Sequence, residues 1–78
     1  MTGIAASSAR AQDICGRLWV ERNAIYKAKG YCFKTQRAIS YFGNAGCMYD
    51  YEEEVPLSRG ERQRIGRIRA EERALGCR

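Results

Sequence analysis

The 78-residue chain has no histidine, a single proline and no cysteine pair spaced as Cys-x-x-Cys. Without histidine, the base that most often activates a serine or cysteine nucleophile is missing. No glycine-rich phosphate loop is present, and no apolar run approaches the roughly 18 to 20 residues that cross a bilayer. We therefore expect a protein that is not an enzyme, takes no cofactor or metal and has no membrane span.

Four cysteines, Cys15, Cys32, Cys47 and Cys77, are the most informative residues present. Structural zinc sites usually take their ligands in close pairs, about two to four residues apart, whereas these cysteines are separated by 17, 15 and 30 positions. An even number of widely spaced cysteines in a short chain indicates disulfides, which persist in oxidising compartments. The sequence therefore predicts a periplasmic or secreted protein with two disulfides.

The charge of the chain is strongly basic. Lysine and arginine number 14 against 9 aspartates and glutamates, a net charge of +5. Such a charge draws a protein toward anionic partners, including nucleic acid and cell-envelope polymers. A chain of this length also buries only about 60% of its unfolded surface, so its core needs the covalent support that disulfides supply.

Apolar spacing and capping residues predict an all-α domain of three helices. The first helix covers residues 13–29, with Asp13 as its N-cap and Gly30 as its stop. Thr35 caps a short second helix over residues 35–42.

A long loop over residues 44–57 precedes the third helix, which is predicted over residues 58–75. Ser58 and Glu61 have the spacing of a capping box, and Gly76 stands where a left-handed cap is favoured.

Helix length limits how the cysteines pair. A helix of about 16 residues spans roughly 24 Å, whereas disulfide-linked Cα atoms lie within about 7 Å of each other. Cys15 and Cys32, at opposite ends of the first helix, therefore cannot bond. We favour Cys15 with Cys77 and Cys32 with Cys47 over Cys15 with Cys47 and Cys32 with Cys77. The favoured pairing makes the first and third helices antiparallel.

One charged residue lies on the apolar seam of each long helix. Arg22 shares a face with Leu18 and Ile25, and Glu72 lies between Ile68 and Leu75. A charge on a packing seam is costly unless it is paired. Because antiparallel helices place Arg22 within about one turn of Glu72, we predict a structural ion pair between them.

Residues 1–11 are predicted to be a signal-peptide remnant or a disordered tail, which leaves residues 12–78 as the folded domain. The segment ends in Ala9-Arg10-Ala11, which has the small-x-small form of a signal-peptidase site.

Six residues are candidates for ligand binding because aromatic faces beside cations hold sugar rings or anionic polymers. They are Trp19, Tyr26, Lys29, Tyr31, Tyr49 and Tyr51. The alternative for the aromatics of the first helix is that they fill a thin core, whereas Tyr49 and Tyr51, in the loop, are less committed to packing.

Arginines on the third helix suggest nucleic-acid binding as an alternative function. At about 100° per residue, Arg62, Arg69 and Arg73 share one flank, but Arg64 and Arg67 lie nearly opposite. That distribution is typical of a solvated helix with intrahelical ion pairs, so we expect no nucleic-acid partner. The acidic run Glu52-Glu53-Glu54 is likewise typical of a solvated loop rather than of a catalytic carboxylate pair.

The segment from Arg22 to Phe33 resembles the signature of the YARHG domain, a small bacterial domain of exported proteins. Matching positions are Arg22, Asn23, Ile25, Tyr26, Gly30, Tyr31 and Phe33, and the likeness extends over about residues 18–75 through Tyr41-Phe42, the helix start at Leu57 to Glu61, and Ile65, Ile68 and Glu72. Where that signature has Ala-Arg-His, this chain has Lys27-Ala28-Lys29. The resemblance implies an exported helical domain with no established enzymatic activity.

Charge, aromatics and setting together predict a non-enzymatic binding or structural module of the bacterial cell envelope. Its expected partner is an envelope component, either an anionic glycan or another protein.

Overall fold

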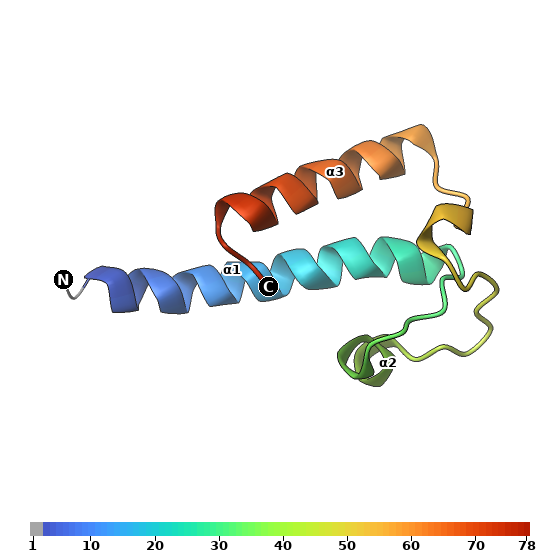
Figure 1. Ribbon diagram of the computed structural model, residues 1–78, viewed down its shortest axis with the longest axis horizontal. Helices are drawn as coiled ribbons and strands as arrows, with labels where there is room; N and C mark the ends of the chain where they lie inside the picture. Colours follow the sequence, from blue (N-terminus) through green and yellow to red (C-terminus); the bar gives the residue numbers. More distant parts are fainter. Residues whose placement is uncertain (1–2) are drawn as a thin grey trace.

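A computed structural model describes residues 3–78, with side chains for residue 10 and residues 12–78. Helix α1 covers Gly3–Ala28, α2 covers Gln36–Phe42, and α3 covers Arg59–Ala74, while the 3-10 turn η1 covers Glu52–Glu54. Figure 1 shows α3 running back along α1 in the opposite direction, with α2 on the other side of α1. The predicted all-α fold with antiparallel first and third helices is confirmed.

Helix α1 begins at Gly3 rather than at Asp13, so the predicted start is wrong. Asp13 lies inside the helix and does not cap it. The segment before Asp13 contains four alanines, the strongest helix formers. The helix therefore extends through Asp13 toward the N-terminus. Residues 1–2 lie outside the described part of the chain, and a signal-peptide origin for residues 1–11 stays a prediction. Among the described helices, none is long and apolar enough to cross a membrane.

The C-terminal end of α1 is closed by a glycine cap of the Schellman type. Gly30 has a φ of 92°, and its N–H donates to the Lys27 carbonyl at 3.2 Å. The Tyr31 N–H donates to the Tyr26 carbonyl at 3.1 Å, while the rings of these tyrosines lie 5.6 Å apart. This cap reverses the chain and brings Tyr31 back over the helix.

Helix α3 has the cap at each end that its sequence predicts. The Ser58 hydroxyl accepts from the Glu61 N–H at 3.1 Å, and the Glu61 carboxylate accepts from the Ser58 N–H at 2.8 Å. These bonds, with help from Lys29, lower the pKa of the Glu61 carboxyl from its ordinary value. At the other end Gly76 has a φ of 72°, and the Cys77 N–H donates to the Glu72 carbonyl at 2.8 Å.

The core is small and lies between α1, α3 and the chain around α2. Its buried members are Tyr26, Phe33, Ala38, Val55 and Ile65. Phe33 and Phe42 stack with ring centres 5.2 Å apart. None of the large described side chains is completely buried, so the core is as thin as the chain length implies.

Two disulfides hold this core together in the pairing favoured from the sequence. Cys15 and Cys77 join the middle of α1 to the end of α3, with their Cα atoms 5.5 Å apart. Cys32 and Cys47 close the segment that contains α2, with a Cα separation of 5.1 Å. The four cysteines are therefore all oxidised, and none is a free thiolate.

Candidate functional site

Arg22 and Glu72 form a two-pronged ion pair between α1 and α3. Nε of Arg22 donates to Oε1 of Glu72 at 2.9 Å, and Nη2 donates to Oε2 at 3.0 Å. Their side chains are only 19% and 13% exposed. The ion pair predicted from the two helix seams is present, and its role is to fix α3 against α1.

The six predicted ligand-binding residues do not gather in one groove. Tyr26 is 6% exposed and belongs to the core, where its hydroxyl lies 3.5 Å from Oε1 of Glu52. Tyr51, 60% exposed, stands apart from the others on the surface. Tyr26 is therefore a structural residue, as the core-filling alternative had it.

Trp19 is partly buried and covered by a cation of its own chain. The guanidinium carbon of Arg37 lies 3.9 Å from the centre of the Trp19 ring, while Tyr41 meets the same ring edge-on at 5.7 Å. A ring already stacked in this way has less face to offer a ligand. The Arg37 contact could not be predicted from local spacing, because it depends on how α2 packs against α1.

Lys29, Tyr31 and Tyr49 lie together beside the end of α1. They line a cavity of about 320 Å³ together with Met48 and Pro56. Tyr49 is half-buried and packs against the core, so it is not the uncommitted surface residue that its loop position suggested. Burial and the neighbouring Glu52 carboxylate raise the pKa of the Tyr31 phenol above its ordinary value of 10.0.

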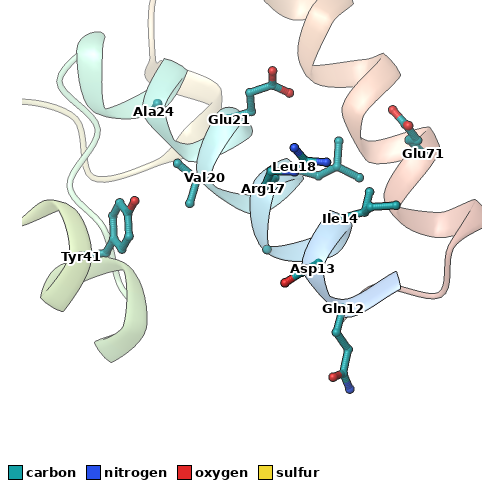
Figure 2. Close-up of a pocket in the computed structure, with 11 residues that line it drawn as sticks. Gln12, Asp13, Ile14, Arg17, Leu18, Val20, Glu21, Ala24, Tyr41 and Glu71 are labelled. Carbon is teal, nitrogen blue, oxygen red and sulfur yellow. The ribbon is translucent and has the colours of Figure 1, made fainter. Parts of the chain in front are cut away.

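A groove runs along α1, and its lining also includes Tyr41 of α2 and Glu71 of α3 (Figure 2). It measures about 880 Å³, and its apolar lining includes Leu18, Val20, Ala24 and Tyr41. The charged residues around it are Asp13, Arg17, Glu21 and Glu71, three acids and one base. This groove is therefore not complementary to an anionic ligand.

A smaller cavity of about 220 Å³ lies where the end of α3 meets α1. Its lining is Arg22, Arg69, Glu72, Arg73, Cys77 and Arg78. Four arginines and one acidic residue thus line it, so the side chains of its lining are mainly cationic.

A protein-family model, that of the YARHG domain, matches residues 1–73, which is nearly the whole chain. The protein belongs to the YARHG domain family. No curated protein and no solved structure matches it.

The YARHG signature coincides with the glycine cap of α1. Tyr26 supplies the carbonyl that closes the cap, and Gly30 supplies the left-handed turn. Lys27-Ala28-Lys29 stands where the YARHG signature has Ala-Arg-His, and its two lysines serve the fold. Nζ of Lys27 donates to the Gly43 carbonyl at 3.2 Å, and Lys29 pairs with Glu61 at 3.3 Å. In this YARHG domain the named motif ties the end of α1 to both other helices.

Asn44 is a structural residue of this YARHG domain that the sequence did not single out. Its Oδ1 accepts from the Phe33 N–H at 2.7 Å, and its Nδ2 donates to the Phe33 carbonyl at 3.0 Å. The only local signal is its place after Gly43, where asparagine is favoured in turns.

The acidic run lies at the surface of this YARHG domain. Glu52, Glu53 and Glu54 form η1 and are all exposed, and Glu52 pairs with Arg69 at 3.1 Å. Over the residues that the structure describes, no group of three or more potential ligands is arranged to hold a metal ion.

Proposed function

We propose that this YARHG domain is an exported, non-enzymatic module that binds an anionic glycan of the bacterial cell envelope, such as peptidoglycan. Its two disulfides fit an oxidising compartment, and the family is one of extracytoplasmic domains. The net charge of +5 favours an anionic partner.

The observation that carries this proposal is the surplus of arginines without a carboxylate partner. The five ion pairs engage Arg22, Lys29, Lys34, Arg64 and Arg69. Among described residues, several further arginines have no acidic group in salt-bridge range, namely Arg17, Arg59, Arg62, Arg67, Arg73 and Arg78. Unpaired guanidinium groups are well suited to carboxylates and phosphates of a polymer.

A protein of the cell envelope is the second candidate partner. Met48 is 70% exposed and Tyr41 is 62% exposed, and methionine and aromatic side chains are enriched in protein interfaces. The exposed apolar residues are dispersed over α2, the following loop and the end of α3, so the glycan version is the better supported.

Retention on purified cell-wall sacculi tests the glycan version. The oxidised domain should be retained at moderate salt more strongly than an unrelated disulfide-linked domain of the same net charge. Equal retention of the two domains would contradict it.

A labelled oligonucleotide in the same buffer tests the nucleic-acid alternative. Because the arginines of α3 are spread around the helix, we expect no mobility shift beyond that of the charge-matched domain. A clear shift together with equal retention on sacculi would replace the glycan by nucleic acid.

A further inference from the structure

We propose that the cavity between Arg22, Arg69, Arg73 and Arg78 is a binding site for one oxyanion group, a carboxylate or a phosphate. This inference rests on the proposed function and names the point at which an anionic polymer would be held. We call the cavity the arginine pocket.

Two of its arginines are fixed by contacts to carboxylates. Arg22 is held by Glu72 through Nε and Nη2, so that among described residues its Nη1 has no carboxylate partner. Arg69 donates from Nη2 to Oε1 of Glu52 at 3.1 Å. The largely buried Glu72 contact orients the Arg22 guanidinium before any ligand arrives, which reduces the entropy lost on binding, whereas the Arg69 pair is 40% and 50% exposed and is a weaker constraint.

The other two arginines are exposed and free of acidic partners in the part of the chain that is described. Arg73 lies in the last turn of α3. Arg78 follows Cys77, whose backbone is held by the cap at Gly76 and whose sulfur is bonded to Cys15. The disulfide therefore brings the backbone at Arg78 to the same hollow as Arg73.

The charge balance of the arginine pocket favours an anion. Of the four arginines that line it, Arg22 pairs with Glu72, the one acidic side chain of the lining. Arg69 pairs with Glu52, so Arg73 and Arg78 supply the surplus positive charge. A hollow lined mainly by charge of one sign concentrates the potential inside it. Guanidinium groups also present paired N–H donors that match the two oxygens of a carboxylate or phosphate.

A purely structural role competes for Arg73. A cation in the last turn of a helix stabilises the negative end of the helix dipole, and that role needs no ligand. It does not involve Arg78, which lies beyond α3, and it predicts no localised response to anions. The experiments therefore remove both arginines, and they measure both binding to sacculi and the NMR shifts of individual backbone amides.

The test compares two double variants of equal charge, Arg73→Ala with Arg78→Ala and the control Arg59→Ala with Arg67→Ala. The four side chains are exposed, so both variants should keep the fold, which the thermal midpoint checks. We expect the first variant to bind sacculi at least about tenfold more weakly, because it loses charge-assisted hydrogen bonds. The control should lose much less. Equal losses would overturn the arginine pocket while leaving the proposed function intact.

Amide NMR titrations give a readout that does not depend on the glycan. Inorganic phosphate and acetate, added separately at constant ionic strength, should shift the amides of residues 73–78 in the wild type and not in the first variant. Whichever anion shifts them at lower concentration identifies the oxyanion preferred. Shifts that are absent with both anions, or equal in the variant, would overturn the site even if the domain is retained on sacculi.

Discussion

The contact between Arg22 and Glu72 shows what a single charged pair does in a core of this size. Both side chains lie on helix seams that would otherwise be apolar, and both are largely removed from water. Replacing such a pair by well-packed apolar residues is often neutral, whereas removing one partner leaves a buried charge alone. The pair therefore contributes more to defining how α3 lies on α1 than to the net free energy of folding.

Arg22→Ala should lower the free energy of unfolding by about 3 kcal/mol or more, because Glu72 would be left buried without its partner. Urea unfolding of the oxidised protein, followed by circular dichroism, measures the change.

Arg64→Ala is the matched control for that measurement. Arg64 also bridges α3 to α1, through Glu21 at 3.4 Å, but the two side chains are 54% and 53% exposed. An exposed pair contributes only about 0 to 1 kcal/mol. Similar losses in the two variants would show that Arg22 and Glu72 are not protected from solvent in solution.

At the scale of the helices, specific capping residues determine where the two long helices end. Glycine closes α1 at Gly30 and α3 at Gly76, each with a positive φ that other residues adopt only under strain. Each turn also directs the next residue back toward α1, Tyr31 onto Tyr26 and Cys77 onto Cys15. The caps thus position the residues that make the tertiary contacts.

Two glycines of the same region should respond to alanine with opposite signs. Gly76→Ala should destabilise the protein by about 1 to 2 kcal/mol through backbone strain alone, because a Cβ there meets no atom within 4 Å. Gly66→Ala, inside α3 and equally open, should stabilise it by about 0.5 to 1 kcal/mol. Chemical unfolding of both variants checks the signs, and a stabilised Gly76→Ala protein would contradict the cap.

Local signals explain which elements were predictable from the sequence. Thr35, Ser58 and Glu61 act through atoms within three residues of themselves, so α2 and α3 could be placed closely. The start of α1 could not, because its alanine-rich first turns carry no apolar stripe. The bonds of Asn44 to Phe33, and the lack of an acidic partner for Arg73 and Arg78 among the described residues, depend on segments meeting in space and leave no trace in local spacing.

For the whole molecule, the two disulfides add to the stability of a core that is too small to hold the fold by packing alone. Natural domains are stable by roughly 5 to 15 kcal/mol, with short chains at the low end. The ring closed by Cys15 and Cys77 spans 62 positions, and that closed by Cys32 and Cys47 spans 15. Constraint of the unfolded chain grows with ring size, so the first disulfide is the more important one.

Replacing Cys15 and Cys77 by serine should lower the stability by about 4 kcal/mol, and replacing Cys32 and Cys47 by about 3 kcal/mol. Thermal unfolding of the two double variants, and of the wild type with and without dithiothreitol, tests whether loss of the Cys15–Cys77 bond is the more destabilising. An unchanged midpoint in the reduced wild type would show that packing alone supports the fold.

The bond between Cys15 and Cys77 has a further consequence for a domain outside the cytoplasm, where proteases are abundant. Any single backbone cut between these two positions, for example in the exposed turn at Glu52–Glu54, leaves the resulting fragments covalently joined. A nicked molecule therefore releases no peptide. A backbone cut that would separate the fragments of a domain without disulfides thus leaves fragments that stay joined until the disulfide is reduced.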